Sequence, residues 1–205
     1  MAAISMAAVP VVGTAPQSEQ SGDSEDMDGW FHPYKLSGAH RLGGAGEQQF
    51  TADELRHAYG MFPSGVTAVC VQGEFGPVGL AASSFTSVSM DPPLVSVCVG
   101  ETSTTWPRMR NAASLGISVL AESQGPAARA LASRAGDKFA DLSYESTPGG
   151  AVFVHGASLW LECVIEQEVV AGDHEIIVLR VTSLQPYPDS SPMVFHGSKF
   201  RQLQP

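Results

Sequence analysis

The sequence predicts a mostly β fold, a closed barrel of antiparallel strands with a few peripheral helices. Three observations favour this class. Apolar and β-branched runs of strand length recur along the chain, short turns containing Gly and Asp separate them, and helical stretches are few. The chain has 205 residues, of which 43% are hydrophobic, so it is long enough for one domain with a sizeable core.

The folded part is expected to begin with a helix. Thr51 to Glu54 form a capping-box pattern, in which the Thr hydroxyl and the Glu carboxylate each satisfy a free amide at the helix start. This helix should run to about Tyr59 and end at Gly60. Seven stretches with strand patterns follow, at residues 65–71, 78–89, 94–99, 115–120, 152–154, 159–170 and 175–184.

Two further helices and two tight turns complete the expected elements. Residues 102–112 begin with hydroxyls and a proline, which indicates a loop and a helix start, and residues 126–132 are an Ala-rich helix. Residues 73–76 should join the first two strands as a hairpin. Gly172-Asp173-His174 should join the last two strands.

The chain divides into a predicted disordered acidic tail, residues 1–46, and a folded domain, residues 47–205. Within the tail, residues 17–28 are acidic and Ser-rich, and they have too few apolar side chains to offset their ordering entropy. The net charge of −10 argues against nucleic acid or an anionic membrane surface as a partner. No apolar run reaches the roughly 18 residues needed to cross a bilayer.

The three cysteines, Cys70, Cys98 and Cys163, all lie inside apolar, strand-like runs. An odd number in such places indicates buried free thiols rather than disulfides or a metal cluster. Free thiols fit a reducing compartment, so a cytoplasmic location is expected.

The most informative stretch for function is rich in hydroxyls. Two small residues, Ala81 and Ala82, precede it and Asp91-Pro92-Pro93 follows it. Small side chains let a flat ring approach the main chain, while hydroxyls can serve a phosphate. The alternative is an edge strand, ended by the prolines, whose hydroxyls bond to water. Five hydroxyls fall within seven residues, Ser83, Ser84, Thr86, Ser87 and Ser89. In strand geometry one face would carry residues 83, 85, 87 and 89.

Four other segments could carry chemistry, and each has a plain structural alternative. Pro63-Ser64-Gly65-Val66 forms a turn that exposes main-chain donors. Ser103-Thr104-Thr105 at a helix start could favour an anion or simply cap the helix. His174 could bond a second substrate or be a solvated turn histidine. The aromatics of Phe195 to Phe200, with Tyr187, could wall a pocket or pack inward.

Other catalytic templates are missing from the sequence. It has no Gly-x-Gly-x-x-Gly between a strand and a helix, and no phosphate loop ending in Gly-Lys-Ser or Gly-Lys-Thr. The Gly-x-Ser-x-Gly pattern of a nucleophile elbow is also missing. His and Cys lack the spacing of metal ligands, so no metal site is predicted.

Taken in order, these segments resemble one family, the short-chain NAD(P)H-dependent flavin reductases with an FMN-binding split β-barrel. The matching segments are Pro63–Val66, Ser83–Val95, Thr102–Thr105, Gly172–His174 and Phe195–Arg201, which span about residues 50 to 203. The resemblance implies a six-stranded Greek-key barrel with a few peripheral helices. It also implies a homodimer with the flavin near the subunit interface.

The resemblance further implies an activity and roles for residues. The activity is hydride transfer from NADH or NADPH to FMN or FAD, with the reduced flavin passing to a partner monooxygenase or halogenase. His174, the implied catalytic residue, would lie on the nicotinamide side. The implied cofactor-binding residues are Pro63, Ser64, Gly65, Val66, Ala81, Ala82, Ser83, Ser84, Phe85, Thr86, Ser87, Ser89, Ser103, Thr104 and Phe200.

One departure from the family pattern stands just before the double serine. A polar Thr or Asn is common there, whereas this chain has apolar Leu80, Ala81 and Ala82, which leaves the choice of flavin open. Two other functions also stay open on this fold, a flavin-retaining oxidase or oxygenase and a non-catalytic flavin-binding partner module. If NADPH is used, the candidates for its 2′-phosphate are Arg129, Arg134 and Lys138.

Overall fold

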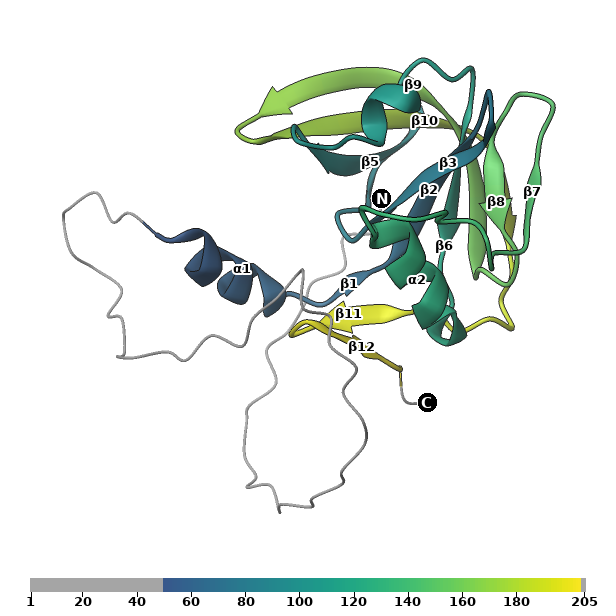
Figure 1. Cartoon of the computed structure of the whole chain (residues 1–205). Helices are drawn as coiled ribbons and strands as arrows, with labels where there is room; N and C mark the ends of the chain where they lie inside the picture. The colour runs from purple at the N-terminus through teal and green to yellow at the C-terminus, as the bar shows by residue number, and fades with distance from the viewer. Residues whose placement is uncertain (1–49, 204–205) are drawn as a thin grey trace. The chain divides into compact units, whose positions relative to one another are not determined.

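A computed structural model of the protein describes residues 50–203, and the predicted acidic tail, residues 1–46, lies outside the described residues. The first element is α1 (Ala52–Gly60), and its predicted capping box is confirmed (Figure 1). The Glu54 amide donates to the Thr51 hydroxyl at 3.2 Å, and the Thr51 amide donates to the Glu54 carboxylate at 2.8 Å. No residue of α1 is buried, and no helix among residues 50–203 is long and apolar enough to cross a membrane.

Seven strands form one antiparallel sheet, which confirms the mostly β class. Their order across the sheet is β3-β2-β6-β9-β10-β5-β4. β9 and β10 are the longest strands and form a ribbon that extends past β5 (Figure 1). The strands are β2 (Thr67–Gly73), β3 (Gly76–Ala82), β4 (Thr86–Met90), β5 (Pro93–Gly100), β6 (Leu115–Val119), β9 (Leu159–Ala171) and β10 (His174–Pro186).

The two outermost strands of this sheet, β3 and β4, are consecutive in the chain and are joined only by Ser83-Ser84-Phe85. That connection spans at most about 14 Å, whereas seven flat strands would be about 29 Å wide. The sheet therefore rolls up until its edges approach, and β3 contacts β5. Within the described residues no hydrogen-bonded ladder joins β3 to β4. The barrel is therefore split, in agreement with the family resemblance, and is not the closed barrel that the strand pattern predicted.

Shorter elements surround the rolled sheet. A three-stranded sheet lies in the order β1-β11-β12, and β7 pairs with β8. Strand patterns did not indicate β7, β11 or β12, whose three residues mix polar and apolar side chains, whereas the wholly apolar β8 was predicted. The elements are β1 (Ser64–Gly65), η1 (Trp106–Arg108), η2 (Glu122–Gln124), α2 (Gly125–Ala132), β7 (Tyr144–Ser146), β8 (Val152–Val154), β11 (Val194–His196) and β12 (Lys199–Arg201).

Two predicted elements were wrong. The single strand at residues 78–89 is interrupted, because the chain leaves one edge of the sheet at Ala82 and joins the other at Thr86. The helix expected within residues 102–112 is only the 3₁₀ turn η1. Three residues per turn place Trp106 and Met109 on the same side, and both are buried, so core packing explains this geometry.

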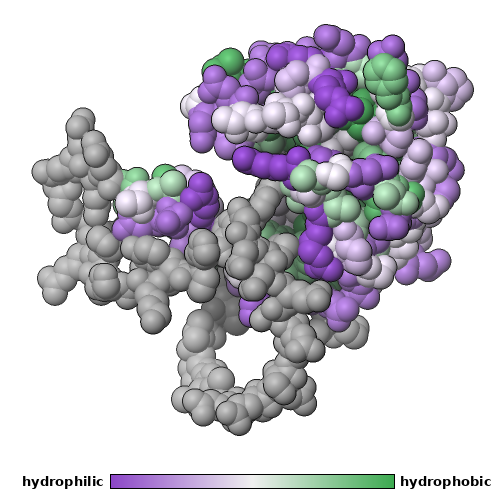
Figure 2. Space-filling view, in the orientation of Figure 1, coloured by the Kyte–Doolittle hydropathy of each residue, from purple (hydrophilic) through white to green (hydrophobic). Residues whose placement is uncertain are grey.

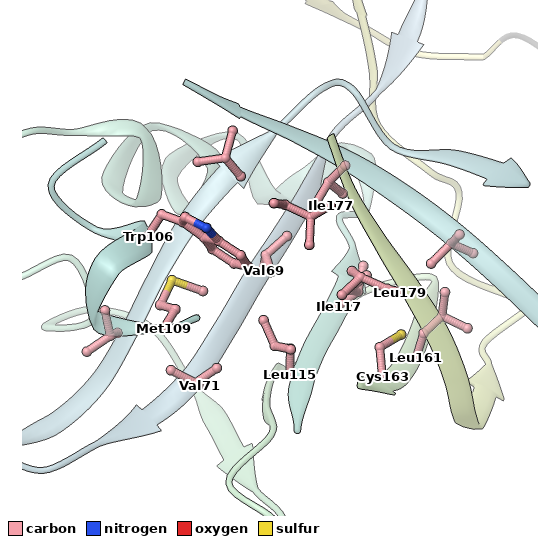
Figure 3. Close-up of a cluster of buried hydrophobic side chains, with 14 residues drawn as sticks. Val69, Val71, Trp106, Met109, Leu115, Ile117, Leu161, Cys163, Ile177 and Leu179 are labelled. Carbon is pink, nitrogen blue, oxygen red and sulfur yellow. The ribbon is translucent and has the colours of Figure 1, made fainter. Parts of the chain in front are cut away.

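The core consists of two clusters that share β2. Alternate residues of β2 point to opposite faces: Val69 and Val71 belong to the cluster inside the rolled sheet, the barrel cluster, while Ala68 and Cys70 belong to the α2 cluster. In the barrel cluster, Trp106 and Met109 from the η1 segment face residues of β2, β6, β9 and β10 (Figure 3). The α2 cluster packs between the sheet, α2 and β8.

Candidate functional site

The segment Ser83–Phe85, called the crossover here, is held to β5 by one side chain. The Ser84 hydroxyl accepts a hydrogen bond from the Cys98 amide at 2.8 Å and donates one to the Cys98 carbonyl at 3.2 Å. A hydroxyl has one donor, so Ser84 has only acceptor capacity left for a ligand. Its hydroxyl therefore braces the crossover, a role that the sequence did not indicate.

The main chain of the crossover remains open. Within residues 50–203, the amides of Ser83, Ser84 and Phe85 donate to no main-chain carbonyl, because the β3 ladder ends at Ala82 and the β4 ladder begins at Thr86. Ser83 is exposed, and the next two residues are half-buried. Three consecutive amides without main-chain partners next to small side chains form a row of donors that a planar acceptor can approach.

The apolar residues before the crossover are explained by packing. Leu80 packs against the barrel cluster and Ala81 against the α2 cluster. Ala82 is buried, and its carbonyl accepts from the Thr67 hydroxyl at 3.0 Å. These side chains are therefore part of the core that fixes the end of β3. The next residue, Ser83, carries the first of the open amides.

The later hydroxyls lie on an edge strand, as the proline argument predicted. Thr86 and Ser87 are exposed, and Ser89 is half-buried. A register shift between Ser87 and Ser89 breaks the alternation. The expectation that residues 83, 85, 87 and 89 share a face is therefore wrong, and the binding roles of these three hydroxyls stay predictions.

Pro63 to Val66 lead into the β1–β11 pair, where Ser64 lies opposite Phe195. The Val66 side chain and the partly buried Phe200 both belong to the α2 cluster, which Ala81 also contacts. The rings of Phe195 and Phe200 are 5.7 Å apart, and the Arg129 guanidinium lies 5.8 Å from the Phe200 ring centre. The structure thus places Val66, Ala81 and Phe200 in one cluster, with the aromatics packed inward.

Ser103 and Thr104 lie in the loop between β5 and η1. The Ser103 hydroxyl accepts from the Trp106 amide at 3.1 Å, at the start of η1, and the Ser103 amide donates to the Gly100 carbonyl at 2.9 Å. Because η1 has only three residues, it supplies no helix dipole for an anion. Thr104, which is exposed, and Ser103, whose hydroxyl is bonded to the Trp106 amide, remain predicted phosphate-side residues without the support of a helix dipole.

His174 begins β10 and lies opposite Gly100 at the end of β5. Its Nδ1 is 2.8 Å from Asp173 Oδ1, and the Glu101 amide donates to the Asp173 carbonyl at 2.9 Å. Gly100 is two residues beyond Cys98, about 7 Å along the strand. The braced crossover and the histidine therefore flank the same end of β5, from opposite sides.

Lys138 ties three elements together and is not free for a nucleotide phosphate. Its ammonium donates to the carbonyls of Gly79 on β3 and Leu131 on α2, and to the Thr105 hydroxyl, at 3.0 to 3.3 Å. These bonds use all three donors. Burial lowers the pKa of Lys138, with a smaller lowering by the Arg108 charge and an opposing rise from Cys70.

Arg110 links the loop after η1 to the β9–β10 ribbon. Its Nη2 lies 2.6 Å from Glu168 Oε2 and 3.6 Å from Glu175 Oε2. The hydrogen bond to Glu168, with the charges of both glutamates, raises the Arg110 pKa against a small effect of burial. Sequence patterns could not reveal this contact because its partners lie more than fifty residues away. Among residues 50–203 no group of three or more His, Cys, Asp or Glu could hold a metal ion.

Comparison with known proteins identifies the same region. A family model described as "Flavin reductase like domain" matches residues 59–204. The flavin reductase of Pseudomonas putida is 34% identical over 143 residues, which cover 69% of this chain and 84% of that protein.

Two solved structures are also similar. One is the NADH:FAD oxidoreductase of Streptomyces globisporus C-1027 in complex with NAD and FAD fragments. It has a TM-score of 0.71 and 38% sequence identity, and the match covers 74% of this chain and 92% of that one. The other is the flavin reductase component of a bacterial two-component tryptophan halogenase. It has a TM-score of 0.69 and 34% identity, and the match covers 75% of this chain and 98% of that one.

Proposed function

This chain belongs to the flavin reductase-like family, and from that premise we propose that it transfers hydride from NADH or NADPH to FMN or FAD. The observation that carries the proposal is the row of open amides at Ser83, Ser84 and Phe85. A flavin bound there supplies the two-electron acceptor for the hydride of the nicotinamide. The donor set fits the group, because a flavin ring presents several acceptor atoms along one edge.

The crossover amides would donate to the ring edge and stabilise the negative charge that develops there. Their direction is fixed because the Ser84 hydroxyl holds the crossover to Cys98. Ala81 and Ala82 keep bulky side chains away from that surface. Recognition by the main chain requires no polar side chain before the double serine, so the apolar residues there are compatible with flavin binding.

His174 would orient the nicotinamide nucleotide from the other side of β5. It is exposed at the end of the ribbon and lies opposite Gly100, which has no side chain to block it. No side chain is needed as an acid or base, since hydride passes directly between the two cofactors. The chain therefore acts by positioning its two substrates and by excluding water.

The reduced flavin would pass to a separate monooxygenase or halogenase. A relative with this arrangement is the flavin reductase component of the two-component tryptophan halogenase. Three free cysteines, two of them buried, support a reducing, cytoplasmic location.

We also propose that the protein is a homodimer. The end of α1 and the residues after it expose large apolar side chains, with Tyr59 71%, Met61 59% and Phe62 77% exposed. The helix shows hydrophobic residues beside hydrophilic ones on its surface (Figure 2). Exposed apolar groups of this kind mark protein interfaces. Light scattering should give twice the chain mass of 21.5 kDa.

The activity is tested by steady-state oxidation of NADH and NADPH with FMN, FAD and riboflavin in turn. The proposal expects rapid oxidation whose rate rises with added free flavin and saturates. A protein that retains its flavin through purification and oxidises NADH slowly, whatever flavin is added, would instead be an oxidase or oxygenase. No oxidation with any flavin would favour a binding module.

A further inference from the structure

His174 lies against the main chain of β5. A Cβ placed on Gly100 would lie 3.6 Å from His174 Nε2 and 4.0 Å from Cε1. The ring therefore lies beside Gly100 at the distance of an ordinary van der Waals contact. Its other nitrogen, Nδ1, is 2.8 Å from the Asp173 carboxylate.

This geometry selects one form of the neutral imidazole. A carboxylate only accepts hydrogen bonds, so the nitrogen facing it must carry the proton. Nδ1–H then donates to Asp173, and Nε2 keeps its lone pair. Hydrogen bonding to His174 lowers the pKa of Asp173, which keeps the carboxylate ionised.

The turn that carries Asp173 is itself held. Gly172 adopts φ +66°, a conformation that favours glycine. The Asp173 carbonyl accepts from the Glu101 amide, which extends the β5–β10 pairing by one residue. Asp173 is thus fixed by its main chain even though its side chain is 93% exposed.

We propose that Asp173 is a positioning residue that holds neutral His174 in its Nδ1–H form, so that Nε2 accepts a hydrogen bond from the carboxamide N–H of the nicotinamide. The inference rests on the proposed function, because it assigns a partner to His174 Nε2. It separates two roles within the turn, since His174 would touch the nucleotide whereas Asp173 would act only through His174.

Other charged groups near the ring do not replace Asp173. Glu101 follows Gly100 on β5, and its main-chain amide is bonded to the turn. Glu175 is the next residue on β10, where its side chain points to the opposite face and faces Arg110. On β9 the residue opposite His174 is Ala171, which is uncharged.

The test measures the imidazole form directly and does not need flavin. In protein with 15N-labelled histidine at pH 8, the His174 signals, assigned by their loss in His174→Gln, should show Nδ1 protonated and Nε2 not. Asp173→Ala should move the proton to Nε2, which is favoured in water. Asp173→Asn should preserve the native form, because its amide oxygen still accepts.

Kinetics supply the second readout. Asp173→Ala should raise KM for NADH about tenfold with kcat changed less than about twofold, the loss expected for one misdirected hydrogen bond. Asp173→Asn should restore KM to within about twofold, and Asp141→Ala, an exposed aspartate in the loop before β7, should change nothing.

The outcomes distinguish the two proposals. An unchanged tautomer or an unchanged KM in Asp173→Ala overturns the role of Asp173 while leaving the flavin reductase activity intact. If the native protein oxidises no NADH with any flavin, the proposed function fails, and the tautomer measurement still reports whether Asp173 controls His174.

Discussion

The crossover and the turn at Gly172–His174 are both short connections at the same end of β5, yet they present different chemistry. The crossover offers main-chain amides, and its one committed side chain, Ser84, bonds to the protein. The turn uses its main chain for structure and offers a side chain, His174. The crossover is held to β5 by a side chain, Ser84, whereas the turn is held there by its main chain, through the Asp173 carbonyl.

This difference predicts how each site responds to mutation. Truncation of any single side chain leaves the row of amides in place. Flavin binding should therefore be lost only when the hydrogen bonds between Ser84 and Cys98 are removed. A histidine site can be removed by one substitution that leaves the fold intact. Nucleotide and flavin affinities should therefore separate in variants of the two regions.

The largest expected effect is on stability in base, and it comes from two buried thiols in the sheet that carries both regions. Burial raises the pKa of Cys70, beside β3, to about 12 against a small lowering by Lys138. Burial, with the Glu162 charge, raises that of Cys163, on β9, to about 12. An unfolded thiol ionises near 9, so between pH 9 and 12 the unfolded chain binds fewer protons and the free energy of unfolding falls. Each thiol contributes about 1.4 kcal/mol per pH unit there.

Urea unfolding from pH 8 to 11 measures this loss. Cys70→Ala and Cys163→Ala should each remove about half of the fall in unfolding free energy with pH that the two thiols cause. Below pH 9 both thiols remain protonated and their contribution to stability is fully present. Lys138 has the opposite sign, because its lowered pKa adds stability as pH rises toward 10.5. If the fall in unfolding free energy with pH is unchanged in Cys70→Ala, water already reaches the Cys70 thiol in the folded protein.

The next effect tests the brace. Ser84→Ala removes both hydrogen bonds to Cys98, so the free energy of unfolding should fall by about 1–3 kcal/mol. The flavin dissociation constant should rise about tenfold, because the open amides lose their fixed direction. Thermal unfolding and flavin fluorescence titration measure the two changes.

Ser83→Ala is the matched control, since Ser83 is exposed and its side chain makes no hydrogen bond among those found in residues 50–203. It should change stability by less than about 0.5 kcal/mol and affinity by less than about twofold. Equal losses of affinity in the two variants would show that hydroxyls, and not braced amides, bind the flavin.

The sequence predicted what local patterns determine. The capping box at Thr51, the hairpin after Gly73 and the turn at Gly172 each depend on neighbouring residues, and all three are confirmed. It did not predict the break at Ser83, because nothing in Ser-Ser-Phe reveals that the strands on either side belong to opposite edges of the sheet.

The same limit applies to the site. A lysine in a loop was a reasonable phosphate ligand until the fold brought Gly79, Thr105 and Leu131 around Lys138. For the serine segment the sequence predicted that a flat ring would approach the main chain and that the hydroxyls would serve a phosphate. The fold leaves the amides of Ser83, Ser84 and Phe85 open and commits the Ser84 hydroxyl to Cys98, and the binding roles stay predictions. Pairings between distant segments decide which group of a residue faces solvent.

A smaller effect tests the turn. His174→Ala should raise KM for NADH about tenfold, the loss of about one hydrogen bond, while the flavin dissociation constant stays within about twofold. Steady-state kinetics and flavin titration on the same preparation measure both. This pattern is the reverse of that for Ser84→Ala, and a His174 variant that weakened flavin and nucleotide equally would contradict the separation of the two regions.

The smallest effect concerns the link between them. Arg110 joins the loop that follows Ser103 and η1 to Glu168 and Glu175 on the ribbon. Within residues 50–203 the buried Glu175 Oε2 makes no hydrogen bond, and the Arg110 guanidinium, 3.6 Å away, compensates its charge. Arg110→Ala should raise KM for NADH by about twofold at low salt, because the ion pair is partly exposed and weak. The difference from native protein should shrink near 0.5 M NaCl, where screening weakens the ion pair of the native protein. If Arg110→Ala instead weakened flavin binding twofold, Arg110 would support the flavin site at the crossover. The ion pair with Glu168 and Glu175 would then position the loop that carries Arg110 and not the ribbon.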